Sequence, residues 1–312
     1  MKRILPKIFI WCIGLSLITV VIILSFELLT EWLYDEHQLP KNYGKVQTEL
    51  HLGKGKRQPL IVALGGSEGG NGWNAGQGYR KFLNERGYAF LPIAYFGLDG
   101  IPEKLDRIAL NGVHDAVLNS AKNPNINENC IAIIGVSKGA ELALLLASYY
   151  PEYKAVVALS PSNVNFTSTT NPMIKISFPM VMNTSSFSMN GKALPFVPAS
   201  WKAKLKGFSG DFLGFYEEML SNISAVELAA IKVENINGGI FLVSGKNDDL
   251  WPSTAMSEMM MERLELNNFS HHFEHIEFDG DHYSWGPSMV KVDDFLSKNI
   301  MSKNNSNCKQ LH

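Results

Sequence analysis

The chain has 312 residues, of which 46% are hydrophobic and 19% charged. This composition supplies enough apolar material for one large domain with its own core. The net charge is only −2, so the sequence lacks the electrostatic footprint of a nucleic-acid-binding protein, and we expect no nucleic-acid partner.

A short basic segment followed by an apolar run opens the chain. Lys2, Arg3 and Lys7 precede residues 8–26, which carry no charge. As a helix this run would span about 28 Å, close to the thickness of a bilayer core. Positive charges before the span favour an N-terminus inside and the bulk of the chain outside. We predict a single-pass membrane anchor over residues 1–29, with the rest on the non-cytoplasmic side. The alternative is a cleaved signal peptide, although the run is long for one and no small-residue cleavage site follows it.

Strands and helices alternate over the next part of the chain. Residues 30–58 predict a linker followed by a first, edge strand at 46–52. Short apolar runs predict buried strands, and apolar residues at helical spacing predict helices. The predicted strands lie at 59–64, 88–95, 130–134 and 153–159, and the predicted helices at 79–86 and 102–121. This alternation predicts an α/β fold with a mostly parallel sheet and helices on both faces.

Residues 161–235 interrupt this alternation. A polar stretch is followed by an apolar segment rich in Met, Phe and Pro, and then by several aromatic residues. We interpret the segment as a cap inserted after a sheet strand, and the alternative is a crossover helix with long loops. The alternation then resumes, so that one domain covers residues 59–300 and the tail at 301–312 is expected to be flexible. The later elements are predicted at 239–244, 253–266, 273–278 and 290–296.

Three cysteines are scattered along the chain. Cys12 lies in the apolar run, Cys130 starts a predicted strand and Cys308 lies in the polar tail. We therefore expect neither a disulfide framework nor a metal cluster, and no cofactor.

A Gly-x-Ser-x-Gly turn lies between the predicted strand at 130–134 and a helical segment that begins at Lys138. Gly135 and Gly139 lack a Cβ, so the turn can tighten and the helix can pack close to the strand. A serine hydroxyl becomes a useful nucleophile only when it is exposed, paired with a base and faced by oxyanion donors. This arrangement predicts the nucleophile elbow of an α/β-hydrolase, with Ser137 as the nucleophile.

In that fold an acid follows a later strand, and a histidine follows the last strand. The strand at 239–244 ends in a turn that carries Asp248 and Asp249, and the last strand is followed by His282. His282 would take the serine proton, while the acid would orient the imidazole and stabilise its charged form. We choose Asp248, three residues beyond the glycine of its turn, and Asp249 remains the alternative.

An oxyanion hole in this fold uses two backbone N–H groups. One would come from Lys138, the residue after the nucleophile. The other would come from the glycine-rich loop after the first buried strand, where we choose Ser67, with Gly66 or Glu68 as alternatives. Glu141, three residues beyond Lys138, is expected to form an ion pair with it within the helix.

Four segments together resemble the C-terminal catalytic domain of the acyl-CoA thioesterase and bile acid-CoA:amino acid N-acyltransferase family. They are Gly-Gly-Ser-Glu-Gly-Gly at 65–70, Ala-Tyr-Phe-Gly at 94–97, Ile-Gly-Val-Ser-Lys-Gly-Ala-Glu-Leu-Ala at 134–143 and Val-Ser-Gly-Lys-Asn-Asp-Asp-Leu-Trp-Pro-Ser at 243–253. The resemblance covers roughly residues 60–296. It implies Ser137 as nucleophile, Asp248 as acid and His282 as base. Serine in the elbow implies hydrolysis of an acyl thioester or ester through an acyl-enzyme, since the family members that conjugate amino acids use cysteine.

Two departures from the family pattern bear on the substrate. Long-chain members carry an N-terminal β-sandwich domain, and the roughly thirty residues between the apolar run and the hydrolase strands are too few for one. The predicted topology also puts the site where coenzyme A is not expected. An apolar cap near a membrane favours a small acyl or lipid-like substrate. A peptidase or amidase with the same triad is the alternative, and a binding module without activity is disfavoured because all three triad positions are filled.

Overall fold

The computed structural model describes residues 34–75, 77–169 and 183–301, together with Cys308 and single positions between 11 and 32. The predicted anchor at residues 1–29 therefore falls largely outside the described residues. Within the described part of the chain, no helix combines the length and the apolar character needed to cross a bilayer.

A seven-stranded sheet forms the centre of the fold, in the order β1-β3-β2-β5-β6-β9-β10. Only β1 is antiparallel to its neighbour, so the prediction of a mostly parallel sheet is confirmed. Every residue of β2, β3 and β9 is buried, as expected for parallel strands covered on both faces. The strands are β1 Gln47–Thr48, β2 Gln58–Leu64, β3 Ala89–Ala94, β5 Ile126–Val136, β6 Tyr153–Leu159, β9 Gly239–Gly245 and β10 Phe273–Phe278.

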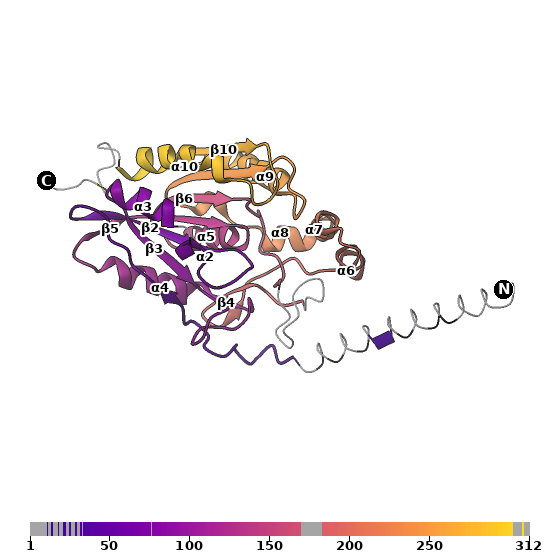
Figure 1. The fold of residues 1–312 in the computed structure, drawn as a ribbon. Coiled ribbons are helices and arrows are strands. Elements are labelled where there is room, and N and C mark those ends of the chain that lie inside the picture. The colour runs from indigo at the N-terminus through magenta and orange to yellow at the C-terminus, as the bar shows by residue number, and fades with distance from the viewer. Residues whose placement is uncertain are drawn as a thin grey trace, which may run out of the picture.

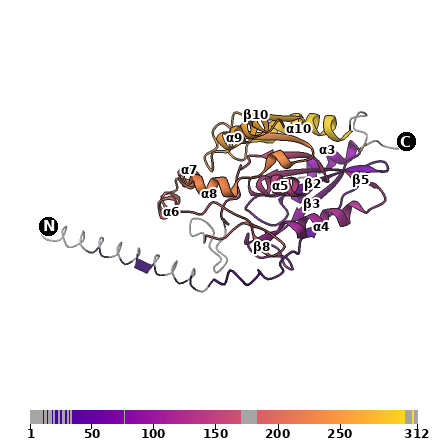
Figure 2. The same cartoon turned by 180° about the vertical axis from the view of Figure 1, so that it is seen from behind.

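Helices cover both faces of this sheet (Figures 1 and 2). Side chains of α3 and α10 share one apolar cluster with one face of the strands, and side chains of α4, α5 and α9 share another cluster with the opposite face. Alternate residues along each strand pack into one cluster or the other, because successive strand side chains point to opposite faces of the sheet. The helices are α2 Gly72–Ala75, α3 Gln77–Glu85, α4 Leu110–Ala121, α5 Lys138–Tyr149, α9 Ser253–Leu266 and α10 Met289–Leu296, with a π-helical turn at Ser297–Met301.

Between β6 and β9 the chain forms a group of short elements whose apolar cluster also includes Trp251 and Met256, which follow β9. The side chains of Ser200, Asp211 and Asn222 accept backbone N–H groups at the starts of its three helices, which explains where these helices begin. These helices lie together at the end of the molecule opposite the C-terminus (Figures 1 and 2). The elements are β7 Phe187–Met189, β8 Lys192–Ala193, α6 Trp201–Phe208, α7 Phe212–Leu220, α8 Ile223–Ala229 and a 3₁₀ helix at Val233–Asn235.

The helix predicted at 102–121 is wrong over its first half. The helix begins at Leu110, and the two residues before it form β4, Ile108–Ala109, which pairs with β7. Arg107 has a φ of 46°, and its guanidinium donates to the Asp106 carboxylate and to a backbone carbonyl of the preceding linker. The apolar residues at 101–109 have helical spacing but are buried in an irregular segment. Tertiary contacts therefore outweigh the local preference for a helix there.

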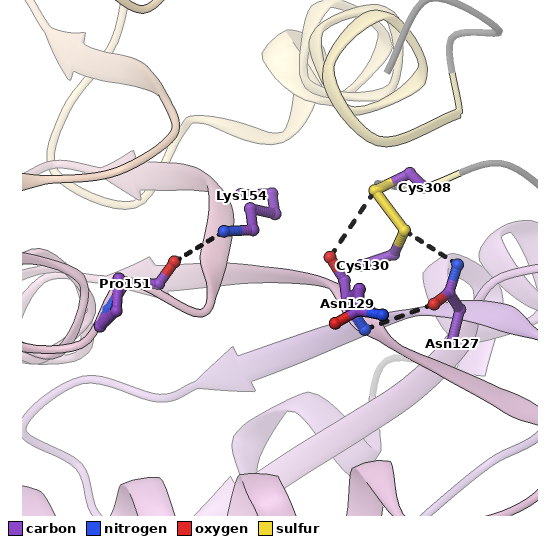
Figure 3. Close-up of a disulfide and its surroundings, with 6 residues drawn as sticks. All are labelled: Asn127, Asn129, Cys130, Pro151, Lys154 and Cys308. Carbon is purple, nitrogen blue, oxygen red and sulfur yellow. Dashed lines mark hydrogen bonds between the residues drawn. A yellow bond between two sulfur atoms is a disulfide. The ribbon is translucent and has the colours of Figure 1, made fainter. Parts of the chain in front are cut away.

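The expectation of no disulfide is also wrong. Cys130 in β5 and Cys308 in the C-terminal tail are joined by a disulfide bond, with their Cα atoms 5.2 Å apart and 178 positions separating them in sequence (Figure 3). The Asn127 side chain donates a hydrogen bond to the sulfur of Cys130. Cys308 is buried in the same apolar cluster as α3 and α10. Cys308 therefore lies against the sheet, which its polar surroundings in the sequence did not indicate, and the rest of the tail predicted to be flexible, beyond residue 301, lies outside the described residues.

Candidate active site

Ser137 stands in a strained turn between β5 and α5. Its φ of 55° and ψ of −122° are rare for a residue with a side chain, and such strain concentrates at functional sites. A Cβ on Gly135 would lie 2.0 Å from the carbonyl oxygen of Gly139, and a Cβ on Gly139 would lie 2.2 Å from that of Gly65. Glycine is therefore required at both positions, and the predicted strand, turn and helix are present.

Asp248 occupies the turn after β9 and has four different donors around its carboxylate. Oδ1 accepts the backbone N–H groups of Leu250 and Trp251, both at 3.1 Å, and Oδ2 accepts the Ser253 hydroxyl at 2.6 Å. The Nδ1 atom of His282 lies 3.0 Å from Oδ1 and 2.9 Å from Oδ2. Hydrogen bonds to a carboxylate stabilise its charged form and fix its orientation.

His282 is completely buried and is held in one tautomer. Because the Asp248 carboxylate only accepts, Nδ1 of a neutral imidazole carries the proton and Nε2 is left as a base. Nε2 is buried and has no hydrogen-bond partner in the described part of the chain. Asp249, the alternative acid, is exposed, and the contact to His282 belongs to its neighbour Asp248.

Ser160, directly after β6, links the histidine loop to the segment that carries Ser137. Its hydroxyl donates to the carbonyl oxygen of His282 at 2.7 Å, and its own carbonyl accepts the indole N–H of Trp251 at 3.1 Å. The preceding carbonyl, of Leu159, accepts the backbone N–H of Ser137 at 2.9 Å. No hydrogen bond joins the Ser137 hydroxyl to Nε2 in the described structure. Such bonds are often loose in unliganded sites and tighten with substrate.

The loop after β2 approaches Ser137 through Gly66. A Cβ on Gly66 would lie 3.2 Å from the Cβ of Ser137. The Glu68 carboxylate accepts the N–H of Gly66 at 2.9 Å, and the Tyr95 hydroxyl donates to the carbonyl of the preceding glycine at 2.6 Å. Ser67, our choice for the second oxyanion donor, lies between Gly66 and Glu68. Its neighbour Gly66 is the residue that comes close to Ser137.

The predicted ion pair between Lys138 and Glu141 is confirmed, and it is completely buried. Nζ of Lys138 lies 3.0 Å from both carboxylate oxygens and donates to the Ser186 hydroxyl at 2.9 Å. The carboxylate also accepts the backbone N–H of Phe166 at 3.1 Å. Burial raises the pKa of Glu141 to about 7 and lowers that of Lys138, while their mutual attraction opposes both shifts. The pair therefore fastens two segments of the insertion to the first turn of α5.

A buried aromatic cluster joins Trp251, which follows β9, to Phe166 and Tyr216 of the insertion. The ring of Trp251 lies 5.4 Å from the His282 ring and 5.4 Å from that of Tyr216. The ring of Phe166 lies 5.0 Å from Tyr216 and 5.9 Å from Trp251. Burial, followed by the nearby Glu141 carboxylate, raises the pKa of the Tyr216 phenol. All three aromatic side chains are buried, so this cluster supports the histidine loop from within the protein.

Sequence reasoning did not assign the residues that hold the triad candidates in place, namely Ser160, Trp251 and Ser253. Trp251 and Ser253 lie in the segment at 243–253 that resembles the family, and this resemblance was the only sequence signal for their role. No motif includes Ser160. In the described ranges, no group of three or more His, Cys, Asp or Glu side chains could hold a metal ion.

Comparison with known proteins places the chain in a family. The family model described as "BAAT / Acyl-CoA thioester hydrolase C terminal" matches residues 113–287, more than half of the chain. Acyl-coenzyme A thioesterase 6 of Mus musculus is 27% identical over 233 residues, which are 74% of this chain and 50% of that protein. Acyl-coenzyme A amino acid N-acyltransferase 2 of the same species is 26% identical over 73% of this chain and 49% of its own length. The chain thus spans about half the length of these curated relatives.

Solved structures share the fold at low sequence identity. The acylaminoacyl peptidase of Pyrococcus horikoshii has a TM-score of 0.55 at 14% identity and covers 84% of this chain and 40% of its own. The α/β hydrolase GrgF from a Penicillium species has a TM-score of 0.50 at 16% identity and covers 83% of this chain and 100% of its own. At this identity the likeness shows an α/β-hydrolase fold and nothing about substrates. Together with the family match, it shows that the chain belongs to the family of BAAT / acyl-CoA thioester hydrolase C-terminal domains.

Proposed function

We propose that this protein is a serine hydrolase that cleaves acyl thioesters or esters through a Ser137–His282–Asp248 triad. One observation carries the proposal. The completely buried His282 bonds through Nδ1 to the Asp248 carboxylate, which also accepts three other hydrogen bonds. Its Nε2 has no partner among the described residues. His282 and the strained Ser137 both follow the carboxyl ends of strands of the same sheet. A buried base without a partner is costly for a fold, and it is the arrangement that a serine nucleophile requires.

In the acylation step, the Ser137 hydroxyl attacks the substrate carbonyl carbon while Nε2 of His282 takes its proton. The oxyanion would be bound by the backbone N–H of Lys138, at the start of α5, and by an N–H of the loop after β2. Helix N-termini suit this task because their first N–H groups have no partner within the helix. His282 then gives the proton to the departing thiol or alcohol as the carbon–sulfur or carbon–oxygen bond breaks.

In the deacylation step, water replaces the departed group. His282 takes a proton from water, the hydroxyl attacks the acyl-serine, and the carboxylic acid leaves as Ser137 regains its proton. The buried ring of Trp251 packs 5.4 Å from the His282 ring and would help to hold the imidazole in place through both steps.

A fluorophosphonate probe with a fluorescent tag tests the nucleophile. We expect wild-type protein to be labelled, Ser137→Ala to remain unlabelled, and Ser148→Ala to be labelled like wild type. Ser148 is a matched control because it lies on the same helix, with its hydroxyl bonded to a helix carbonyl. The acyl-enzyme should appear by mass spectrometry as an adduct on Ser137 after mixing with a neutral thioester. Folded wild-type protein that is never labelled would refute the proposal, and labelling that persists in Ser137→Ala would refute the assigned nucleophile.

We further propose that the catalytic domain lies on the non-cytoplasmic side of a membrane, held by an N-terminal anchor. The cationic residues before the apolar run support this side. The disulfide between Cys130 and Cys308 supports it independently, since structural disulfides persist in oxidising compartments. Cells would be quenched with acid and their free thiols blocked, and the protein then treated with a thiol-reactive polyethylene glycol before and after reduction. Two additional modified cysteines after reduction are expected, and modification of both without reduction would contradict the proposal.

A further inference from the structure

Helix α6 of the insertion presents a stripe of large apolar side chains to solvent. Trp201, Leu205 and Phe208 are 46%, 65% and 40% exposed. They stand at positions i, i+4 and i+7 of the helix and therefore share one face. In Figures 1 and 2, α6 lies at the end of the molecule opposite the C-terminus. Single exposed apolar residues are ordinary on protein surfaces, whereas a stripe of three on one short helix indicates a contact surface.

The opposite side of α6 is fixed to the protein. Ala203 is completely buried in the apolar cluster of the insertion, and its N–H donates to the Ser200 hydroxyl at the start of the helix. The buried Lys204 places its Nζ 5.3 Å from the centroid of the Trp201 ring, a favourable position for a cation over an aromatic face. The helix is thus held from within, and its apolar stripe faces outward.

Lysines accompany this stripe. The sequence of α6, Trp-Lys-Ala-Lys-Leu-Lys-Gly-Phe, contains no acid. Lys202 and Lys206 are four residues apart and share one flank of the helix, and Lys202 also lies 2.7 Å from a carboxylate oxygen of Glu218 on α7. Trp, Leu and Phe on one face with Lys beside them are typical of helices that lie in a membrane interface. Lysine is depleted from protein–protein interfaces, so this composition favours a bilayer over a protein partner.

A short tether would keep the domain close to the proposed anchor. The Tyr34 hydroxyl donates to Asp106 at 2.9 Å, and the Arg107 guanidinium donates to the carbonyl of Gln38 at 2.9 Å, so the linker is bound to the domain from residue 34 onward. The apolar run ends at residue 26, and the eight steps from there to residue 34 span at most about 28 Å. A tether of this length gives a high effective concentration, so a small contact surface is sufficient for docking.

We infer that α6 docks the catalytic domain onto the surface of a phospholipid bilayer, with its apolar stripe in the boundary between head groups and acyl chains. Lys202 and Lys206 would extend along this boundary and meet anionic head groups. The inference goes beyond the proposed hydrolase activity and rests on the proposed anchor. Ala203 shares its cluster with Trp251, whose ring lies 5.4 Å from that of His282. Docking would therefore hold the insertion, and the proposed triad behind it, at the bilayer.

Spin labelling of the full-length protein in vesicles of phosphatidylcholine and phosphatidylglycerol tests this inference. A nitroxide is attached at Leu205→Cys, or at Leu266→Cys as the matched control, since Leu266 is a 74% exposed leucine at the end of α9. Cys12→Ser removes the remaining thiol, because Cys130 and Cys308 are joined to each other. Collisions with oxygen report apolar surroundings, and collisions with a neutral nickel chelate report water. We expect a higher ratio of oxygen to nickel collisions at Leu205→Cys, at a depth of about 5–10 Å into the boundary.

Further substitutions test whether the stripe is responsible. Trp201→Ser and Phe208→Ser, added to the Leu205→Cys protein, should lower its collision ratio to that of the Leu266→Cys protein. Val290→Ser, which changes an exposed apolar residue of α10, should leave the ratio unchanged. The replaced side chains are exposed, so thermal melting should show that each variant is folded.

The wild-type protein provides a second measurement that needs no substitution. Trp201 and Tyr149 are both about half exposed, at 46% and 50%. In vesicles, hydroxyl radicals should oxidise Trp201 less than Tyr149 when each is compared with the unfolded protein, because the bilayer covers α6. Equal oxidation would overturn the inference even where a labelled variant fails to fold.

The outcomes separate this inference from the proposals on which it rests. If the protein floats with the vesicles but the nitroxide at Leu205→Cys is as open to nickel as the control, the docking surface is wrong and the anchor stands. Loss of collisions with both reagents would mean that protein, such as a second copy of this chain, covers α6, and would also overturn the inference. Protein that does not float with vesicles would overturn the proposed anchor together with the docking. The fluorophosphonate probe tests the triad separately from all of these.

Discussion

The buried ion pair between Lys138 and Glu141 allows a sharp test of how the site is held together. Lys138→Met keeps the apolar stem of the side chain but removes its charge. Glu141 would then remain as a buried carboxylate with the Phe166 N–H as its recorded donor. Breaking a buried pair on one side typically costs about 3–5 kcal/mol, because the remaining charge is uncompensated. We expect this loss in the free energy of unfolding.

The structure sets the expected size of the coupling. Side-chain exposures are 1% for Lys138 and 0% for Glu141, and the charged atoms are 3.0 Å apart. At an effective dielectric constant of about 20, unit charges at that distance attract by about 5 kcal/mol. Desolvation of the two charges offsets part of this attraction. A variant that lacks only one charge leaves the other buried without its partner, and removing the second charge as well relieves that cost. The double variant Lys138→Met/Glu141→Gln should therefore be more stable than Lys138→Met alone, with a coupling of about 2 kcal/mol or more.

Urea unfolding of the wild type, the two single variants and the double variant, followed by tryptophan fluorescence, measures this cycle. Midpoints are comparable between variants only where the slopes agree. Additive changes, with each single variant losing less than about 1 kcal/mol, would refute the reasoning, since that is the behaviour of an exposed ion pair. A repeat of the cycle with Lys81 and Glu85, whose charged atoms lie 3.9 Å apart on the exposed face of α3, supplies the exposed control.

Two further predictions concern the proposed triad and its support, and a third concerns His275 on β10. Asp248→Asn should lower kcat on a neutral thioester by about 10⁴-fold because the imidazole loses its orienting acceptor, whereas Asp249→Asn should lose less than about 10-fold, and equal losses would contradict the choice of acid. Ser160→Ala removes the hydrogen bond to the His282 carbonyl and should lower kcat more than it changes KM, so a change confined to KM would exclude a positioning role. Burial lowers the pKa of His275 against the opposing charges of its acidic neighbours, so its contribution to stability is full above a pH of about 6.5 and is lost as the pH falls toward the folded pKa. His275→Gln should therefore lose less stability than wild type between pH 7.5 and pH 5 in thermal melts, and identical losses would contradict this.

The sheet was predictable because its signals are local. Continuous apolar runs gave the strands of a parallel sheet, and the bounds of β6, α9 and β10 agree with the runs read from the sequence. The elbow was predictable because the packing there leaves no space for a Cβ at Gly135 or Gly139, so the sequence must show glycine. The order of serine, acid and histidine along the chain follows from the same topology.

The supporting contacts were not predictable because each depends on a partner far along the chain. Ser160 bonds a carbonyl 122 positions later, and Cys308 pairs with a cysteine 178 positions earlier. The guanidinium of Arg107 donates hydrogen bonds to carbonyls of a linker about 70 residues earlier, and the segment around it is irregular although its apolar spacing predicts a helix. The spacing of apolar residues along the chain does not predict such pairings, because each depends on a single side chain and a distant partner.

The charged side chains around Ser137 differ in their exposure. Lys138, which follows Ser137, is buried and is neutralised by Glu141 and the insertion. Glu68, Asp249 and Asp281 lie exposed on the surrounding loops, and the Glu68 carboxylate accepts the N–H of Gly66 beside Ser137. The buried pair holds the fold together, whereas the exposed acids lie on loops. Membership of a family that is named for coenzyme A thioesters therefore does not by itself fix the leaving group, because the loops at the mouth can change while the sheet and the triad stay the same.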